Sequence, residues 1–283
     1  MKVCCLASGS KGNCTFVETE DVKFLIDCGL AIKDLEVRLN QIGESVSNIN
    51  FVLVTHEHSD HVSGIAKLVN KYGITPYIYY KNLQVMKQKT KLPADKFVLF
   101  YQNDFFIGST IITPFEISHD SNSCVAFKIC SPSGKFVIIT DTGYIDKGNF
   151  DFFNNSDLVI IESNHNVELL KNNSNYTLVL KKRILSNVGH LSNKQCATYI
   201  EEFIKRGCKQ FVLAHLSENN NTPRVAVIDV TEHLLACDKI ENKHYYLDLA
   251  WQSQVGTLYN ICNNLKENDQ NQENKEGGSS ERE

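Results

Sequence analysis

Four side chains of the kinds that bind metals follow directly after a short apolar segment, and this run constrains the chain more than any other feature. The segment FVLV at 51–54 is continuously apolar, as in a strand buried on both faces, and it continues into THEHSDH at 55–61. Side chains alternate along an extended strand end, so His56 and His58 project to the same side. Asp60 and His61 follow where the chain turns into a helix, and they face a second point close by. Imidazole combined with carboxylate favours Zn²⁺, Mn²⁺ or iron over Ca²⁺.

Further residues of ligand type end other predicted strands. His119 follows a strand that ends at Ser118, Asp141 ends a strand after an apolar run, and His215 ends another in the same way. A site with two metal ions needs more ligands than the first run provides, and these three residues supply them. Ligands gathered at strand ends give a rigid site on a sheet scaffold. We therefore expect these residues to gather at strand ends into one site for metal ions.

The order of predicted strands and helices indicates mixed sheets with helices outside them. A helix is predicted from about Val62 to Gly73, and a capping box that joins Ser192 to Gln195 predicts the start of another. A strand at 244–249 is the last one predicted. Because strands and helices alternate while many strands form hairpin-like pairs, we expect a sandwich of two sheets.

The formal net charge of −4 argues, taken alone, against a protein that grips nucleic acid through bulk positive charge. However, residues 266–283 hold three basic and six acidic residues and no aliphatic or aromatic one, which leaves a net charge of −1 for residues 1–265. We expect residues 1–265 to form a single domain and residues 266–283 to be a disordered polar, acidic tail. Two bound divalent cations would make the folded part positive.

The sequence indicates a cytoplasmic protein that does not enter a membrane. No run approaches the 18 or more apolar residues of a membrane span, and the apolar run near the start is too short for a signal peptide. The ten cysteines include no C-x-x-C pair and several lie in apolar runs, so we expect reduced cysteines that pack as small hydrophobes. Nothing in the sequence indicates the oligomeric state.

The H-x-H-x-D-H run and the later ligand residues together resemble the ligand series of the metallo-β-lactamase superfamily. The resemblance covers the chain from about Met1 to about Asn220 and implies an αββα fold, with the site at one edge between two sheets. It implies that one metal ion is bound by His56, His58 and His119, that the second is bound by Asp60, His61 and His215, and that Asp141 bridges both.

One more position matches this superfamily outside the ligand set. Asp27, in LIDCG at 25–29, matches an aspartate that supports the site from behind the ligands. Taken alone, Asp27 is equally well interpreted as a polar strand end before a turn.

Two short motifs favour phosphodiesters as the substrates. The runs IESNH at 161–165 and VGHLS at 188–192 resemble motifs of ribonuclease Z, where a glutamate and a histidine move a proton to the leaving oxygen. This resemblance implies that Glu162 orients His190 and that His190 is the general acid. Asp60 would both ligate a metal ion and hold or accept the proton of the attacking water.

Six motifs occur together in the order found in the YycJ (WalJ) group of bacterial exonuclease-like proteins: LASGSKGN at 6–13, VTHEHSDH at 54–61, TDTGY at 140–144, ESNH at 162–165, GHLSN at 189–193 and AHLS at 214–217. This resemblance implies a 5′→3′ exodeoxyribonuclease that acts on DNA rather than RNA and has a role in DNA repair. The two divalent metal ions expected are Zn²⁺ or Mn²⁺, with iron as a further candidate. The alternatives are an RNA-processing nuclease of the ribonuclease Z type and a small-molecule ester or thioester hydrolase on the same scaffold.

Contacts to the substrate are less constrained by the sequence. Ser10 and Asn13 lie in a glycine-containing loop that offers hydrogen-bond donors to phosphate, although a tight hairpin loop explains them equally well. Asn164 and His165 are also candidate contacts, and the alternative is a capped helix start. The basic run at 181–183 either follows a nucleic-acid backbone or is a solvated helix face. His233 and His244 have no evident ligand companions and are assigned to no site.

Overall fold

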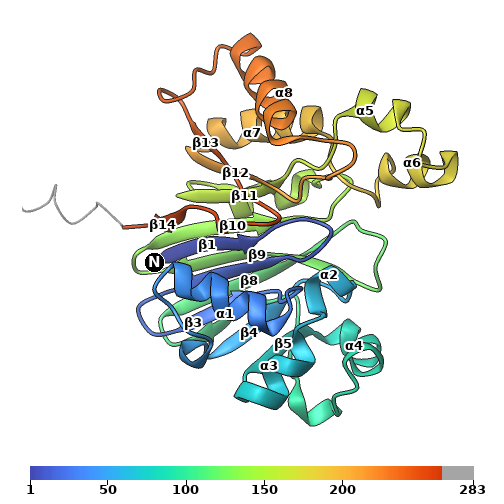
Figure 1. The fold of residues 1–283 in the computed structure, drawn as a ribbon. Helices are drawn as coiled ribbons and strands as arrows, with labels where there is room; N and C mark the ends of the chain where they lie inside the picture. The colour runs from blue at the N-terminus through green and yellow to red at the C-terminus, as the bar shows by residue number, and fades with distance from the viewer. Residues whose placement is uncertain (263–283) are drawn as a thin grey trace, which may run out of the picture.

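Two seven-stranded sheets pack face to face between two layers of helices (Figure 1). The computed structural model describes residues 1–262. The first sheet contains, in spatial order, β14 (Leu258–Asn260), β1 (Lys2–Ala7), β2 (Cys14–Glu18), β3 (Lys23–Ile26), β4 (Phe51–Val54), β5 (Thr75–Tyr79) and β6 (Val98–Phe100). The second contains β13 (Tyr246–Leu249), β12 (Gln210–Ala214), β11 (Leu158–Glu162), β10 (Gly134–Ile139), β9 (Cys124–Ser131), β8 (Thr110–Ile117) and β7 (Phe105–Ile107). The αββα architecture expected from the sequence is confirmed.

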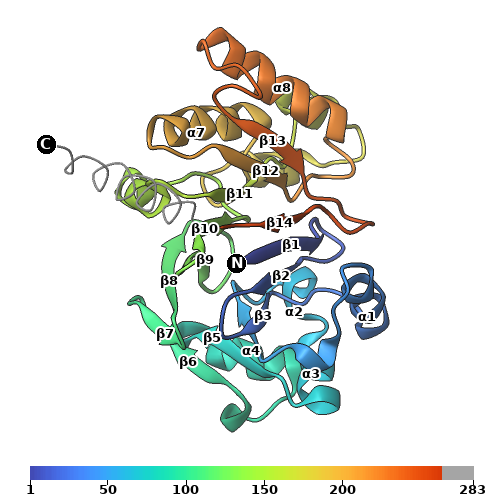
Figure 2. The same cartoon turned by 90° about the vertical axis from the view of Figure 1, so that its left-hand side faces the viewer.

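The helices divide between the outer faces of the two sheets, as the view in Figure 2 shows. On the side of the first sheet lie α1 (Ile32–Gln41), α2 (Ser59–Val62), α3 (Ile65–Tyr72) and α4 (Leu83–Thr90). On the side of the second lie α5 (Val167–Asn172), α6 (Leu178–Ile184), α7 (Asn193–Lys205) and α8 (Pro223–Ala236). Short 3₁₀ helices occupy Val46–Asn48, Tyr80–Asn82, Ala94–Lys96 and Lys147–Phe153. In Figure 1, α5 and α6 project from the body of the molecule at the right.

Apolar side chains are buried in three layers, because each sheet is covered on both faces. Residues such as Phe24 and Phe127 fill the space between the sheets. Leu35 of α1 and Leu68 of α3 pack on the outer face of the first sheet. Ile200 of α7 packs on the outer face of the second. Burial on both faces explains why β4 and β11 are continuous apolar runs in the sequence.

Each sheet is antiparallel in one part and parallel in the other. The strands β3 to β6 are parallel in the first sheet, and β10 to β13 are parallel in the second. The residues that follow β3 and β4 meet those that follow β10, β11 and β12 at one edge, since their side chains make direct contacts there. The fold therefore collects loops from both sheets at a single edge, as expected for a site between them.

Three elements differ from the sequence predictions. The helix predicted from Val62 begins at Ser59 and is divided into α2 and α3, because the Gly64 backbone N–H donates a hydrogen bond of 2.8 Å to the Cys28 carbonyl instead of to the helix. The contact is close, since a Cβ on Gly64 would stand 2.5 Å from the Cys28 sulfur. The sequence predicts a helix from Val225 to Cys237, but α8 begins two residues earlier, at Pro223, and the Thr222 side chain caps its N-terminus. The strand after residue 244 is not the last, since β14 follows and pairs antiparallel with β1.

The structure bears on the expectations about membrane spans and cysteines. Within residues 1–262, no helix is long and apolar enough to cross a membrane. All ten cysteines are free and seven of them are buried, as expected for small apolar side chains. The predicted tail at 266–283 lies outside the described residues, so the domain boundary at 265 stays a prediction.

Candidate metal centre

The predicted ligands meet where strands of both sheets end. β4 ends at Val54, and the chain stays extended to His58, which precedes the single turn of α2. This turn directs Asp60 and His61 back to the same edge. The second sheet brings Asp141 from the end of β10 and His215 from the end of β12.

The first predicted set of ligands is assembled. His56, His58 and His119 each place a ring nitrogen within 4.8 Å of the other two. The ring centroids of His56 and His58 are 4.6 Å apart, and that of His119 lies 5.1 Å from that of His56. His56 and His119 are buried, whereas His58 is half-buried at the rim. Three converging imidazoles are a common zinc-binding arrangement.

The second predicted set lies beside the first. Asp60, His61 and His215 place ligand atoms within 4.8 Å of one another, and Asp60 Oδ2 is 3.8 Å from His215 Nε2. Asp141 stands between the two sets: its Oδ2 is 3.2 Å from His61 Nε2, and its Oδ1 is 3.9 Å from His119 Nε2. The position of Asp141 is therefore compatible with the bridging role expected for it.

The donor atoms fit divalent cations. Among the described residues, His56 Nε2 and His215 Nε2 are buried without a hydrogen-bond partner. Buried polar atoms without partners are costly, and metal coordination would satisfy them. Burial and the neighbouring His61 lower the pKa of His56 well below its usual value, which favours the neutral imidazole that binds metals.

Three residues of this edge share a left-handed backbone conformation. The φ angles are 61° at Asp27, 60° at Asp141 and 54° at His215. Residues other than glycine visit this region at a cost of about 1–2 kcal/mol. Each of the three stands directly after a strand or close to its end, so the turn stops the strand and keeps the side chain at the site edge. Strained backbone of this kind clusters at functional sites.

Asp27 lies behind the second predicted set of ligands and contacts His61. Its Oδ2 is 2.8 Å from His61 Nδ1 and accepts a hydrogen bond of 2.9 Å from the Thr55 hydroxyl. Its Oδ1 accepts a hydrogen bond of 2.8 Å from the Thr55 backbone N–H. A carboxylate in this position fixes the orientation of the His61 ring, whose Nε2 faces Asp141 Oδ2 and Asn13 Nδ2.

Glu162 is fully buried at the end of β11 and holds two histidines. Its Oε1 lies 2.8 Å from Nδ1 of His190 and 2.8 Å from Nδ1 of His215. Its Oε2 accepts hydrogen bonds of 3.1 Å from the backbone N–H groups of Thr142 and Leu191. Burial opposes ionisation, but His190 and the other partners overcome it and lower the pKa of Glu162 to about 2. The contact with His190 is the one expected from the sequence, and the contact with His215 is new.

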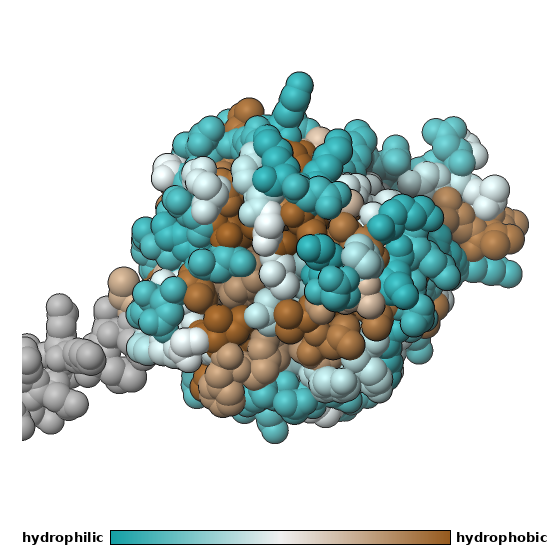
Figure 3. Space-filling view, turned by 90° about the horizontal axis from the view of Figure 1, so that it is seen from below, coloured by the Kyte–Doolittle hydropathy of each residue, from teal (hydrophilic) through white to brown (hydrophobic). Residues whose placement is uncertain are grey.

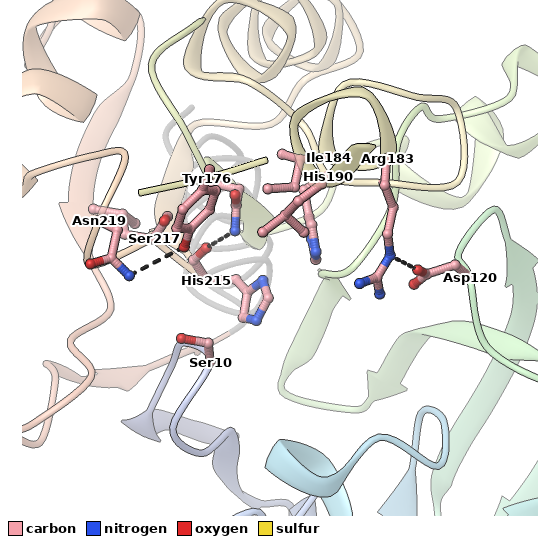
Figure 4. Close-up of a pocket in the computed structure, with 13 residues that line it drawn as sticks. Ser10, Asp120, Tyr176, Arg183, Ile184, His190, His215, Ser217 and Asn219 are labelled. Carbon is pink, nitrogen blue, oxygen red and sulfur yellow. Dashed lines mark hydrogen bonds and ion pairs between the residues drawn. The ribbon is translucent and has the colours of Figure 1, made fainter. Parts of the chain in front are cut away.

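A cavity of about 170 Å³ opens beside His190 and His215 (Figure 4). Ser10 and Asn164, two of the predicted substrate contacts, line it, and Tyr176 and Ile184 close it from the side of α6. Asn219 Nδ2 donates a hydrogen bond of 3.2 Å to the Tyr176 hydroxyl.

The other two predicted substrate contacts are placed away from this cavity. Asn13 is buried, and its Nδ2 donates a hydrogen bond of 3.2 Å to Asp60 Oδ2 and lies 2.9 Å from His61 Nε2. His165 is fully buried. Asn13 therefore contacts two of the predicted ligands, and neither side chain lines the cavity.

One ion pair at the cavity was not anticipated. Arg183 Nε pairs with Asp120 Oδ2, and both residues line the cavity. Asp120 directly follows His119, so its place near the ligands could have been inferred. Arg183 lies in a basic run whose partner only the fold reveals, since 62 residues separate the two positions.

A sequence model of the Metallo-beta-lactamase superfamily matches residues 7–182, which is more than half of the chain. The chain belongs to the metallo-β-lactamase superfamily. The matched range includes the run at 55–61 as well as His119, Asp141 and Glu162. Membership in this superfamily, with the histidine and aspartate clusters described above, implies that divalent metal ions are bound at this edge.

Two curated relatives in the superfamily match most of the chain. Exodeoxyribonuclease WalJ of Streptococcus pneumoniae is 35% identical over 237 residues, which covers 82% of this chain and 88% of the relative. Exodeoxyribonuclease YycJ of Bacillus anthracis is 34% identical over 231 residues, which covers 81% of this chain and 87% of the relative.

Solved structures show the same fold. The metallo-β-lactamase fold protein YhfI from Bacillus subtilis superposes with a TM-score of 0.67, covering 91% of this chain and 98% of that chain at 18% sequence identity. At this level of identity the comparison supports the architecture and not the substrate.

Proposed function

We propose that this chain is a metal-dependent exodeoxyribonuclease that degrades DNA from the 5′ end. The observation that carries the proposal is the meeting of two sets of predicted metal ligands with the Glu162–His190 pair at one edge, beside a cavity that His190 and His215 line. The names of the curated relatives support DNA as the substrate, and the chain covers most of the length of each.

Each ligand set would hold one divalent cation, and Asp141 would contact both. When bound, the two cations supply a nucleophilic water at neutral pH and neutralise charge on the phosphate. The mixture of imidazole and carboxylate donors favours Zn²⁺ or Mn²⁺ over Mg²⁺, with iron as a further candidate.

Two side chains of the protein would take part in the proton transfers of the reaction. Asp60, whose carboxylate faces His215 and accepts from Asn13, would hold the proton of the attacking water or orient that water. His190 faces the cavity with Nδ1 held by Glu162, so Nε2 can give its proton to the departing oxygen. The charge of Glu162 raises the pKa of His190 against the effect of its burial, which favours the protonated ring that a general acid needs.

The lining of the cavity suits one nucleotide unit of a single strand. Tyr176, Leu180 and Ile184 give it an apolar wall from the side of α6, while Ser10 and Asn219 add polar groups. Aromatic and apolar walls accept nucleobases without regard to sequence. A cavity of about 170 Å³ is too small for a duplex, so the substrate would enter it as a single strand.

The outer surface of α6 continues the apolar character beyond the cavity. Leu178 and Val179 are 75% and 79% exposed. Figure 3 shows an apolar area at the right-hand end of the molecule, the side on which α6 lies in Figure 1. Unstacked bases of a strand leaving the cavity would find apolar contacts there. Lys182, exposed on the same helix, offers a contact to the phosphate backbone.

We further propose that the enzyme works in the cytoplasm and takes part in DNA repair. The ten free cysteines suit a reducing compartment. The role in repair rests on the resemblance to the YycJ group alone.

The substrate class is tested with purified protein loaded with Zn²⁺ or Mn²⁺. It is given bis(p-nitrophenyl) phosphate, a glutathione thioester, and DNA and RNA strands of matched sequence. We expect hydrolysis of the phosphodiester and of DNA, loss of both with a chelator, and slower turnover of RNA. Hydrolysis of the thioester alone would contradict the nuclease proposal, and preference for RNA would favour the ribonuclease Z type of activity.

A further inference from the structure

A second group of ligand-type side chains lies on the outer helix layer, apart from the cavity. Glu201 of α7, His233 of α8 and Cys237, which caps the C-terminus of α8, each place a ligand atom within 4.8 Å of the other two. His233 and Cys237 are four residues apart, so their side chains are neighbours on one face of the helix end. Glu201 reaches them because α7 and α8 pack side by side (Figure 1). The expectation that His233 has no ligand companions is therefore wrong.

The two separations from His233 Nε2 to the other ligand atoms are close to those of a tetrahedral site. Glu201 Oε2 is 3.5 Å from His233 Nε2, and His233 Nε2 is 4.0 Å from Cys237 Sγ. Zinc bonds of about 2.1 Å to nitrogen and oxygen and about 2.3 Å to sulfur place tetrahedral ligands roughly 3.4–3.6 Å apart. Small rotations of partly exposed side chains are enough to close the remaining difference.

The carboxylate of Glu201 is already oriented for this role. Its Oε1 pairs with Lys205 Nζ at 2.7 Å, which leaves Oε2 directed at His233. The side chains of Glu201 and His233 are 20% and 31% exposed, so an ion can reach them from solvent. Cys237 carries a free thiol at the same place.

We propose that Glu201, His233 and Cys237 bind a third divalent cation of the Zn²⁺ class, with water as the fourth ligand. Thiolate and imidazole donors select Zn²⁺ or Co²⁺ over Mg²⁺ and Ca²⁺. On binding, the Cys237 thiol releases its proton to solvent as the sulfur–metal bond forms. The ion joins the C-terminal end of α8 to α7, and it is a structural ion rather than a catalytic one.

The distance between the two centres supports a role separate from catalysis. The N-terminus of α8 follows Asn221, whose side chain donates to the carbonyl of Asn164 at the cavity. Cys237 caps the other end of this 14-residue helix, which is about 20 Å long at 1.5 Å per residue. The proposal therefore does not depend on which substrate the catalytic edge takes.

Cobalt substitution distinguishes the third site from the catalytic pair. The predicted catalytic ligands are all histidine and aspartate, so a sulfur-to-cobalt charge-transfer band in the near ultraviolet reports a cysteine ligand. The full chain, kept reduced by a reagent without thiols, is titrated with Co²⁺. We expect the band to appear with one equivalent of Co²⁺ beyond the two at the catalytic edge. Absence of the band in the wild type would overturn the proposal.

Variants assign the band to Cys237. We expect Cys237→Ser to lose the band while keeping two metal ions per chain and full phosphodiesterase activity. Cys262→Ser is the matched control, because Cys262 is the exposed cysteine and lies near β14, and this variant should keep the band. A band that survives Cys237→Ser would place the thiolate elsewhere and overturn the proposal.

Metal content gives a second, independent measurement. Wild-type protein equilibrated with Zn²⁺ should retain three ions per chain after removal of free metal, and His233→Ala should retain two. His244→Ala is the control histidine and should retain three. Two ions in the wild type, or no difference between the two histidine variants, would contradict the proposal.

Discussion

At the scale of single residues, Glu162 contacts both the proposed proton donor and one of the proposed metal ligands. One carboxylate oxygen holds both His190, the proposed proton donor, and His215, a proposed metal ligand. The other oxygen is fixed by two backbone N–H groups, so the carboxylate itself has little freedom. A single buried charge thus sets the orientation of an acid and of a ligand together.

If His190 is the general acid, its removal should matter only when the leaving group needs a proton. We predict that His190→Ala lowers turnover of DNA by about 10²–10⁴-fold. Turnover of bis(p-nitrophenyl) phosphate should change little, because nitrophenolate leaves without protonation. Both rates are measured on protein whose metal content matches the wild type. Equal losses on the two substrates would remove His190 from the role of acid.

Asp27 is predicted to act on metal affinity through His61. Asp27→Asn keeps the size of the side chain and tolerates the left-handed backbone at this position, but it removes the charge that holds the His61 ring. We expect the affinity for the second ion to fall by about 10–100-fold, measured by competition with a chelator. Asp34→Asn, on an exposed face of α1, is the control and should leave affinity unchanged. Unchanged affinity in Asp27→Asn would leave Asp27 with a purely local role.

Individual residues differ in how far the sequence predicts them. The gathering of the proposed ligands at one edge could be inferred from the sequence, because histidine and aspartate at strand ends are chemically distinctive and lie in recognisable motifs. Arg183 and Glu201 were not predictable, because their partners are distant in sequence or on another helix, and a charged residue on a helix is usually solvated. Asn13 was expected at the phosphate but instead contacts Asp60 and His61.

At the scale of elements, the site depends on how closely the loop after β3 approaches α2. A Cβ built on Gly29 would stand 1.6 Å from the backbone oxygen of Asp60. The same oxygen accepts a hydrogen bond of 2.7 Å from the backbone N–H of Asn13. The glycine therefore allows three loops to meet at the second ligand set.

Substitution of this glycine should displace α2. We predict that Gly29→Ala lowers the free energy of unfolding by about 3 kcal/mol and weakens metal binding, because backbone atoms must move apart. Gly43→Ala is the control: a Cβ there meets nothing within 4 Å, and its positive φ alone should cost about 1 kcal/mol. Urea unfolding of both variants measures the difference. Equal losses in the two variants would contradict the close-packing argument.

Elements with long apolar patterns were predictable, and short ones were not. β4 and β11 are apolar throughout, and the capping box that joins Ser192 to Gln195 forms as expected. β14 has only three residues and is held by pairing with β1, a contact between opposite ends of the chain that no local pattern reveals. The division between α2 and α3 likewise arises from tertiary packing at Gly64.

At the scale of the whole molecule, the two ends of the described chain lie side by side at one edge of the first sheet. The Met1 amino group donates a hydrogen bond of 2.9 Å to the Ile261 carbonyl, and the Ile261 N–H donates one of 2.8 Å to the Met1 carbonyl. Ile261 also packs in the core between the sheets. β14 is therefore part of the fold, although it lies beyond the range that matches the superfamily.

Truncation tests the role of β14. We predict that a chain ending at Thr257, without β14, loses about 4 kcal/mol of unfolding free energy. The reason is that β1 loses one of its two paired strands and that the buried side chain of Ile261 is removed. A chain ending at Cys262 keeps β14 and should match the full chain within about 0.5 kcal/mol. Similar stability of the two truncated chains would show that β14 is dispensable.

The net charge has a different meaning once the fold is known. Residues 1–265 carry a formal net charge of −1, and the proposed ions would make the protein positive at the edge where a phosphate would bind. A nuclease of this kind therefore needs no large basic surface. Its activity on DNA should depend on bound metal more than on any single lysine or arginine.

The central claim, a metal-dependent exonuclease that starts at the 5′ end, is tested most directly by end-labelled DNA. The full chain with Mn²⁺ or Zn²⁺ is given one strand labelled at the 5′ end and the same strand labelled at the 3′ end. The account predicts that the 5′ label is released first as a mononucleotide, that the 3′-labelled strand shortens gradually, and that a chelator stops both. First release of the 3′ label, or labelled internal fragments from the outset, would contradict it.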